Sequence, residues 1–366
     1  MNLPQLLAWL RRDPSFMSCV TRWEVLPAQP AKYAPFPEGL HPALVTALKS
    51  RGIAQLYTHQ SEAVAQALAG KSTVVVTPTA SGKTLCYNLP VVHSILTDPS
   101  ARALYLFPTK ALAQDQLAQV KELIEPTGAQ IHPYVYDGDT PANLRPHIRQ
   151  AGHIVVTNPD MLHTGILPHH TRWVRLFENL KYVVIDELHT YRGVFGSHLA
   201  NVLRRLHRIC RFYGSDPQFL CSSATIANPK ELAERLTGKP MHLVDDNGAP
   251  RGEKHFIIYN PPVVTQDGLR EPLLRATRRI AATFLKHDIQ TIVFARSRLN
   301  TEVLVTYLKE EMAKGSRGTT TKRAREIRGY RGGYLPLQRR EIERGLRDGD
   351  VLGVVSTNAL ELGIDV

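Results

Sequence analysis

The sequence VVVTPTASGKT, residues 74–84, is the feature that most constrains the fold of this chain. A run of β-branched apolar residues breaks here into a loop of small residues that ends in Gly82, Lys83 and Thr84. A buried strand that leads into such a loop points successive backbone N–H groups at phosphates, and the following helix presents its positive end to them. Thr77 stands where the GxxxxGK(S/T) pattern has its first glycine. The segment therefore predicts a phosphate-binding loop of relaxed form.

A second apolar run, YVVIDELH at 182–189, ends in two adjacent carboxylates, Asp186 and Glu187. In combination with the loop, Lys83 is expected to reach the β- and γ-phosphates of ATP, while Thr84 and Asp186 hold Mg²⁺. Glu187 is placed to act as general base for an attacking water, since the sequence contains no site for another phosphate acceptor. The two motifs together predict an NTPase with ATP and Mg²⁺ as cofactors. The loop residues expected to bind ATP are Thr79, Ala80, Ser81, Gly82, Lys83 and Thr84.

Three further positions are candidates for the same site. Gln60, in LYTHQ, carries an amide that can donate and accept together, as reading an adenine edge requires, although a lone glutamine is also common on helix surfaces. His189 lies too far along the chain to touch the metal, and we expect it to link the nucleotide site to the next motif. In SSAT, residues 222–225, the hydroxyls of Ser223 and Thr225 are candidates for this coupling, or alternatively for a helix cap, for which Asn228 is the better candidate.

The charge balance favours a polyanionic partner. Lys and Arg number 45 against 33 Asp and Glu, a net charge of +12. Neutralising phosphates releases counterions and drives association with nucleic acid. Solubility alone is the simpler reading of the same surplus.

Other sequence features exclude several classes of protein. No apolar run approaches the roughly 20 residues that a membrane span needs, so no membrane partner is expected. The N-terminal arginines follow a short apolar stretch, the wrong order for a signal peptide, which favours a cytoplasmic location. The cysteines form no CxxC pair, and the sequence therefore indicates neither a zinc site nor a disulfide framework: Cys19, Cys86, Cys210 and Cys221.

The order of apolar runs and amphipathic stretches predicts an α/β protein with two lobes. Residues 1–50 are expected to be an accessory segment whose prolines disfavour long regular elements before HPALVTALKSRG. Residues 51–245 alternate short apolar strands with helices, the pattern of a parallel sheet covered on both faces. Residues 246–262 are expected to be a linker, and 263–366 a second, incomplete lobe of the same kind. A basic loop at 315–333 is either solvated or faces nucleic acid.

Together these blocks resemble the superfamily 2 helicases of the DEAD/DEAH type. FPTKAL (107–112) and TNPDML (157–162) resemble the family's motifs Ia and Ib, and TIVFARSR (291–298) and STNALELGIDV (356–366) resemble motifs IV and V. The resemblance implies two RecA-like lobes, with Gly363 and Asp365 facing the nucleotide. It also implies contacts to a nucleic-acid backbone from Thr109, Lys110, Thr157, Asn158, Arg296 and Thr357.

Two longer segments narrow the resemblance to the YprA/MrfA-type DNA helicases. They are DELHTYRGVFGSHLANVLRRL and YRGGYLPLQRREIERGLRDGDVLGVVSTNALELGIDV. This branch implies a DNA-repair translocase that moves 3′→5′ on single-stranded or partly duplex DNA and carries a C-terminal metal-binding cysteine cluster. The sequence ends directly after motif V, without that cluster and without motif VI, which supplies arginine fingers.

The expectation is therefore an ATP-dependent DNA helicase present as an N-terminal portion. Two alternatives stay open. One is a catalytically impaired fragment that binds ATP and nucleic acid. The other is an RNA helicase of the DEAD-box kind, against which DELH and the YRGGYLP segment count.

Overall fold

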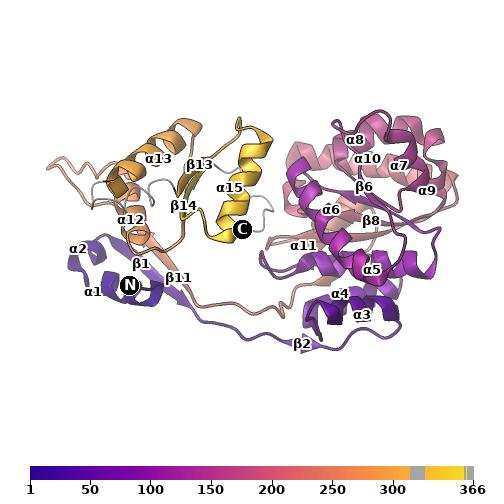
Figure 1. Cartoon of the computed structure of the whole chain (residues 1–366), viewed down its shortest axis with the longest axis horizontal. Helices are drawn as coiled ribbons and strands as arrows, with labels where there is room; N and C mark the ends of the chain where they lie inside the picture. Colours follow the sequence, from indigo (N-terminus) through magenta and orange to yellow (C-terminus); the bar gives the residue numbers. More distant parts are fainter. Residues whose placement is uncertain (314–325, 358–359, 361–366) are drawn as a thin grey trace. The chain divides into compact units, whose positions relative to one another are not determined.

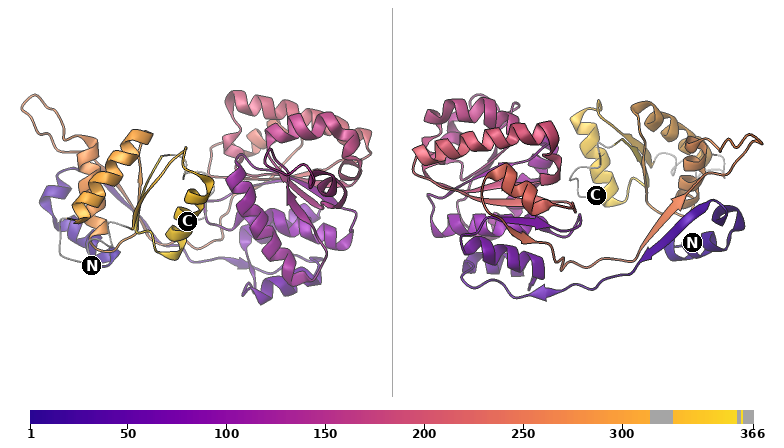
Figure 2. Two further views of the ribbon diagram at one scale, coloured as in Figure 1. Left: turned by 45° about the horizontal axis from the view of Figure 1, so that its top comes forward. Right: turned by 180° about the vertical axis from the view of Figure 1, so that it is seen from behind.

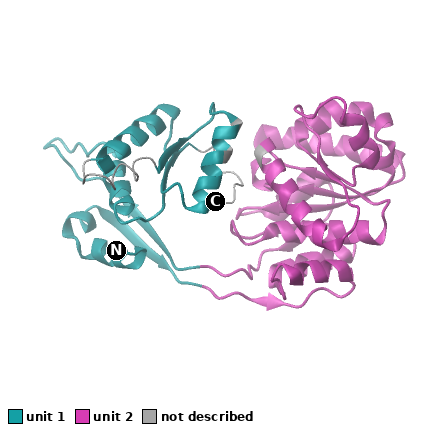
Figure 3. Ribbon diagram, in the orientation of Figure 1, with its two compact units in different colours: residues 1–28, 252–366 teal, residues 29–251 magenta. Residues whose placement is uncertain are grey.

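The computed structural model describes residues 1–313, 326–357 and 360. The chain divides into two compact units (Figure 3), and each is described by itself. Unit 2 is Gln29–Arg251, and unit 1 combines Met1–Ala28 with Gly252–Val366. The predicted boundary at residue 50 falls inside unit 2, and the predicted linker at 246–262 spans the junction between the units.

Unit 2 is built on a seven-stranded sheet in the order β10-β4-β9-β8-β5-β7-β6. All neighbouring strands in this sheet run parallel. This confirms the α/β class and the parallel sheet that the sequence predicts. The strands are β4 (Thr73–Val76), β5 (Arg102–Leu106), β6 (Pro133–Val135), β7 (Ile154–Thr157), β8 (Leu180–Ile185), β9 (Gln218–Ser223) and β10 (His242–Val244).

Helices cover both faces of this sheet (Figure 1), and Figure 2 shows the same layers from two further sides. One layer consists of α3 (Pro42–Ser50), α4 (Thr58–Leu68), α5 (Lys83–Thr97) and α6 (Lys110–Ile124). The other consists of α7 (Arg145–Ala151), α8 (Pro159–Met161), α9 (Val174–Glu178), α10 (Gly193–Phe212) and α11 (Pro229–Thr237). Short 3-10 or π segments are η1 (Glu125–Thr127), η2 (Leu162–Ile166), η3 (Leu167–Arg172) and η4 (Leu188–Thr190), and β2 (Tyr33–Ala34) pairs with β3 (Leu56–Tyr57).

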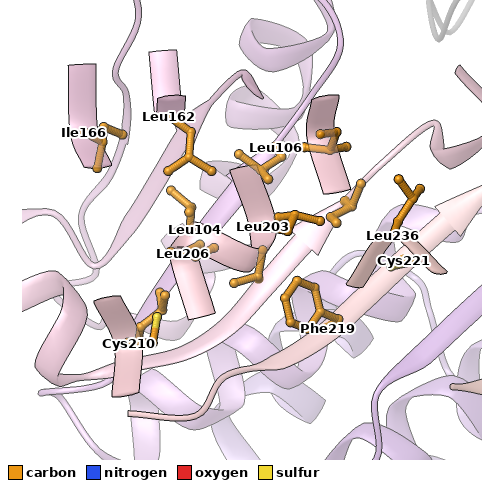
Figure 4. Packing of buried hydrophobic residues seen from close by; sticks show 14 of the residues in the cluster. Leu104, Leu106, Leu162, Ile166, Leu203, Leu206, Cys210, Phe219, Cys221 and Leu236 are labelled. Atoms are coloured by element: carbon orange, nitrogen blue, oxygen red, sulfur yellow. The ribbon is translucent and has the colours of Figure 1, made fainter. Parts of the chain in front are cut away.

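The strand sequences explain the two layers. Successive side chains of a strand point to opposite faces, so Leu104 and Leu106 join the cluster under α10, while Ala103 and Tyr105 join the cluster under α5 and α6. Phe219 lies with Leu203 and Leu206 of α10 and other apolar side chains of the first cluster (Figure 4). Because both faces are buried, these strands read as continuous apolar runs, which is why they could be located from the sequence.

Unit 1 contains a smaller parallel sheet in the order β12-β14-β13. Its elements are α12 (Leu273–Leu285), β12 (Thr291–Phe294), α13 (Arg298–Ala313), β13 (Ile327–Tyr330), α15 (Pro336–Asp348) and β14 (Gly353–Ser356). One apolar cluster lies between the sheet and α12 and α13, and a smaller one lies under α15.

The N-terminal segment differs from the expectation of few regular elements. It forms α1 (Leu3–Arg12), α2 (Pro14–Met17) and β1 (Val20–Leu26), and β1 pairs antiparallel with β11 (Lys254–Tyr259). The prolines that suggested irregular structure begin at Pro27, directly after β1, so they do not interrupt the strand. The partner β11 lies within the predicted linker, and a pairing across more than 200 residues has no local sequence signal.

None of the helices in the described ranges is long and apolar enough to cross a membrane.

Candidate nucleotide and nucleic-acid site

Three neighbouring strands of unit 2 bring the predicted nucleotide motifs to one edge of the sheet. Strands β4, β9 and β8 are adjacent, and all three run in the same direction. Their carboxyl ends therefore open onto the phosphate loop, the SSAT segment and the Asp-Glu pair. In open α/β sheets this edge is where ligands bind.

Hydrogen bonds within the phosphate loop fix its conformation. Lys83 Nζ donates to the carbonyls of Thr77 and Pro78, each at 2.9 Å. The hydroxyls of Thr77 and Ser81 lie 2.6 Å apart. Thr77 thus ties the loop together at the position where the common motif has a glycine, which explains how the relaxed form keeps its shape.

Gly82 fits the cradle for a steric reason. Its φ is +77°, and a Cβ at this position would lie 2.5 Å from Gln60 Nε2. Ala80 also has a positive φ, of 61°. This backbone favours glycine and small residues and leaves room for a phosphate to approach the main chain.

Gln60 and its neighbour His59 brace the loop from α4. Gln60 Nε2 donates to Gly82 O at 2.9 Å, and its Oε1 accepts the Tyr57 N–H at 3.0 Å. His59 Nδ1 accepts the Gly248 N–H at 3.2 Å, so Nε2 carries the proton and donates to Ser81 O at 3.0 Å. Burial lowers the pKa of His59, in keeping with a neutral ring.

The sequence interpretation missed His59. Its one signal was its position beside Gln60, because the Gly248 contact depends on the tertiary structure. Gln60 has both ends of its amide engaged in this structure, and its reading of adenine stays a prediction.

Asp186 is a buried carboxylate with several donors. It accepts hydrogen bonds from the Ser222 hydroxyl, from the Glu187 N–H at 2.8 Å and from the Tyr87 hydroxyl at 3.4 Å. Burial raises the pKa of Asp186, against the effect of these hydrogen bonds. The Tyr87 hydroxyl also donates to Gln116 Oε1, at 2.8 Å. Tyr87 therefore lies between the side chain of Gln116 and the carboxylate that is predicted to hold Mg²⁺.

Glu187 has the properties of a base that works near neutral pH. Burial, assisted by the charge of Asp186, raises its pKa to about 7. A general base is most effective when its pKa lies near the working pH. The residue occupies a left-handed backbone conformation with φ of 51°, at the turn between β8 and η4.

His189 joins the Asp-Glu pair to the SSAT segment, but through the backbone. Its Nδ1 lies 3.3 Å from Glu187 Oε2 and accepts the Ala224 N–H at 3.3 Å. The Ser223 hydroxyl is buried without a hydrogen-bond partner in the described part of the chain, and Thr225 is exposed. The hydroxyl that reaches the active-site carboxylate is that of Ser222, a residue that the sequence interpretation did not select.

Lys83 lies near enough to the carboxylates of Asp186 and Glu187 for their charges to affect its pKa. Burial lowers its pKa, while the charges of Glu187 and Asp186 oppose that shift. Within the described ranges, no three His, Cys, Asp or Glu side chains gather as a metal site would require. An Mg²⁺ ion here would depend on Asp186, Thr84 and substrate oxygens, the usual arrangement for magnesium on a nucleotide.

The predicted backbone-binding residues of unit 2 lie at the ends of neighbouring strands β5 and β7. Thr109 accepts the Leu112 N–H at 3.3 Å as the cap of α6, and Lys110 forms an exposed 2.7 Å ion pair with Asp139. Asn158 Oδ1 accepts the Met161 N–H at 2.8 Å, which leaves its amide nitrogen without a partner in the described ranges.

Thr157 is a different case, because its side chain is buried. Its hydroxyl donates to Tyr136 O at 2.6 Å, so it presents no donor at the surface in this structure.

In unit 1, Arg296 is exposed directly after β12, and the Thr357 N–H donates to Tyr330 O at 3.2 Å after β14. Gly363, Asp365 and most of the basic loop at 315–333 lie outside the described residues. Of that loop's cations, Arg328 and Arg331 are described, and Arg331 forms a 2.6 Å ion pair with Glu302.

Comparison with known proteins agrees with this geometry. Residues 57–232 match the family model described as DEAD/DEAH box helicase. The chain is 61% identical over 366 residues to a Bacillus subtilis protein named "Uncharacterized ATP-dependent helicase YprA", covering 100% of this chain and 48% of that protein. It is 36% identical over 371 residues to the ATP-dependent helicase HRQ1 of Saccharomyces cerevisiae, covering 100% of this chain and 34% of the relative.

A solved structure is similar over the whole chain. It is the DUF1998 helicase MrfA bound to DNA and AMPPNP, with a TM-score of 0.94, 59% identity, and coverage of 100% of this chain and 50% of that one. The chain thus spans about half the length, or less, of these relatives. Taken with the converging nucleotide motifs, these matches show that residues 57–232 form a DEAD/DEAH box helicase domain.

Proposed function

We propose that this chain binds and hydrolyses ATP with Mg²⁺ and couples the hydrolysis to movement on DNA, as part of an ATP-dependent DNA helicase. The observation that carries the proposal is the convergence of Lys83, Asp186 and Glu187 at the ends of adjacent strands. A phosphate loop, a buried carboxylate and a second carboxylate with a pKa of about 7 are the groups that hydrolysis of a nucleoside triphosphate requires.

The residues present fit both the nucleotide and its metal. Gly82 has a positive φ, and a Cβ at this position would collide with Gln60. Because glycine has no side chain, phosphate oxygens can approach the loop backbone here. Lys83, now bonded to two loop carbonyls, has a flexible stem that can turn toward phosphates. Asp186 and Thr84 would hold Mg²⁺, which neutralises phosphate charge. Glu187 would take the proton of the attacking water.

DNA is the preferred partner within this proposal. The relative of known structure is described as bound to DNA, and the surplus of 12 positive charges suits a phosphate backbone. The exposed Lys110 and the free amide nitrogen of Asn158 are the donors at the strand-binding edge. Single-stranded or partly duplex DNA is the expected substrate, RNA is less favoured, and a role in DNA repair follows from the resemblance.

The proposal includes a cytoplasmic location. All four cysteines are free thiols, as expected in a reducing compartment.

The test is ATP binding and single-turnover hydrolysis with and without single-stranded DNA. Lys83→Ala should weaken ATP binding by about 100-fold or more, because buried charge-assisted contacts of this kind contribute several kcal/mol. Glu187→Gln should keep binding and reduce hydrolysis by about 100-fold or more. Lys71→Ala, which removes an exposed lysine before β4, is the matched control and should change neither.

Two outcomes would reject parts of the proposal. Unchanged ATP affinity in Lys83→Ala would remove the loop from the nucleotide site. Binding of ATP and DNA without any DNA-stimulated hydrolysis in the wild-type chain would favour the alternative, a binding fragment with negligible turnover.

A further inference from the structure

A basic pocket lies in unit 2 outside the nucleotide site. Its volume is about 460 Å³, and it is formed by the segment after β6, helix α7 and the π and 3-10 segments η2 and η3. Its charged residues are Arg145, Arg149 and Arg172; His169 also lines it, and no carboxylate does.

One of these arginines is held in place. Arg145 Nε donates to Thr140 O at 3.1 Å, and Nη2 donates to Asp137 O at 3.3 Å. Its guanidinium lies 5.4 Å from the centre of the Tyr136 ring. Its Nη1 makes no hydrogen bond within the described ranges. A guanidinium fixed in this way loses little conformational entropy when it binds an anion.

The other two arginines carry uncompensated charge. Arg149 is half-buried on α7, and Arg172 is exposed at the end of η3. Neither side chain forms an ion pair or hydrogen bond within the described ranges. Positive charge gathered in a concave site without acidic residues attracts an anion more strongly than the same charge on a convex surface.

The pocket adjoins the segment that is predicted to grip the strand. Met161, whose N–H is capped by Asn158, lines the pocket. The Thr157 hydroxyl is bonded to the carbonyl of Tyr136, another lining residue. Asp137, whose carbonyl holds Arg145, begins the turn that contains Asp139, the partner of Lys110. The segment 136–139 therefore contacts both groups of predicted backbone-binding residues: Tyr136 is bonded to Thr157, and Asp139 is paired with Lys110.

We propose that this pocket binds a phosphate of the nucleic-acid backbone, next to the stretch of strand held at Asn158. The inference rests on the proposed function, since it extends the path of the DNA over unit 2. Guanidinium groups bind phosphate oxygens in bidentate geometry, and they do so without reading base sequence. A polynucleotide is a better occupant than an isolated anion because Asn158, a predicted backbone contact, is hydrogen-bonded to the lining residue Met161.

The experiment measures the affinity of the full chain for fluorescently labelled oligo-dT at several salt concentrations. The test variant is the double substitution Arg149→Gln and Arg172→Gln, which spares the structural bonds of Arg145. The matched control is Lys49→Gln with Arg51→Gln, which removes two cations from the C-terminal end of α3, in the helix layer on the opposite face of the sheet, together with the 3.5 Å ion pair of Arg51 with Glu122.

The test variant should bind DNA about tenfold more weakly at low salt. The slope of log affinity against log salt should fall by about 0.7, since that is the contribution of one lost phosphate contact on a single strand. The control should change affinity by less than about twofold. The difference between test variant and wild type should disappear with oligonucleotides too short to reach from Asn158 into the pocket, while ATP affinity stays at the wild-type value.

The outcomes separate this inference from the proposed function. If wild-type chain does not bind oligo-dT at all, the DNA-binding part of the proposed function fails and this inference fails with it. If wild-type chain binds and the test variant behaves like the control, only the pocket is excluded. A pocket that takes inorganic phosphate, detected as phosphate-dependent thermal stabilisation lost in the test variant, with no effect on DNA affinity, would also overturn the inference.

Discussion

The two units differ in how completely the described strands of their sheets are covered, and the nucleotide motifs of unit 2 follow strands that are buried on both faces. In unit 2 every residue of β4 is buried, and helices pack on both faces of the sheet. In unit 1, β12 buries Val293 but leaves Ile292 and Phe294 exposed by 40% and 57%. The loops of unit 2 are therefore anchored by strands fixed on both faces, which suits a site whose groups must be held within fractions of an ångström.

The largest expected effect compares the same residue type in the two units. Phe219→Ala, in the buried cluster of Figure 4, should lower the free energy of unfolding of unit 2 by about 3–5 kcal/mol. Phe294→Ala, in unit 1, should change stability little because its ring is already exposed. Denaturation followed by Trp173 fluorescence, with Trp9 and Trp23 replaced by Phe, reports on unit 2, and Trp23 fluorescence, with Trp9 and Trp173 replaced by Phe, reports on unit 1. Equal destabilisation by both substitutions would contradict the difference in burial between the two sheets.

The second prediction concerns the free energy of unfolding that unit 2 loses by burying the carboxylate of Glu187. The pKa of Glu187 is raised from 4.5 to about 7 in the folded chain, so between these values the unfolded state loses its proton first. Stability then falls as pH rises, by up to about 3 kcal/mol above pH 7.

Glu187→Gln removes this penalty. It should raise the free energy of unfolding of nucleotide-free protein at pH 8 and leave it nearly unchanged at pH 4.5, in urea denaturation at both values. Equal stabilisation at both pH values would mean that burial of the carboxylate charge is not the cause.

The third prediction addresses the N-terminal contribution to unit 1. Trp23 Nε1 donates to His255 Nδ1 at 2.9 Å across the β1–β11 pair, and Arg11 lies 4.8 Å from its ring centre. Trp23→Ala should therefore destabilise unit 1 by about 2 kcal/mol, from lost ring packing and this hydrogen bond. Faster amide hydrogen exchange should appear at residues 254–259 and not in the sheet of unit 2. Exchange that accelerates equally in both units would contradict their independence.

The smallest expected effect lies on the surface of unit 2. Lys110→Ala breaks an exposed ion pair with Asp139 and should change the free energy of unfolding by less than about 0.5 kcal/mol. The same substitution should weaken DNA binding measurably, because Lys110 is a predicted phosphate contact. A loss of stability comparable to that of Trp23→Ala would assign Lys110 a structural role instead.

Much of unit 2 could be predicted because its signals are local. The run at 74–76 is continuous and apolar because both of its faces are buried, and it leads directly into the phosphate loop. The Asp-Glu pair follows another such run. Residues 1–28 were harder to interpret, since β1 is stabilised by β11, which lies more than 200 residues away.

Within the site, the sequence predicted which types of side chain are present but not which of them contact each other. SSAT offers adjacent hydroxyls, and the sequence cannot tell which of them faces Asp186. The pleat of β9 decides it, because successive side chains point to opposite faces, and Ser222 is the one that reaches the carboxylate. The resemblance likewise implies a nucleic-acid contact from Thr157, and the sequence does not show that its hydroxyl is buried against Tyr136 in this structure.

The sequence by itself determined the α/β class, the order of the motifs and the chemical groups available for phosphate and metal. These follow from hydrophobic periodicity and from residue types at short spacing. The tertiary structure alone decided that His59 connects Ser81 to Gly248, that Tyr87 contacts Asp186, and that three arginines line one pocket with Met161. Each of these depends on contacts between segments far apart in the chain, whose geometry is fixed only when the sheet has brought them together.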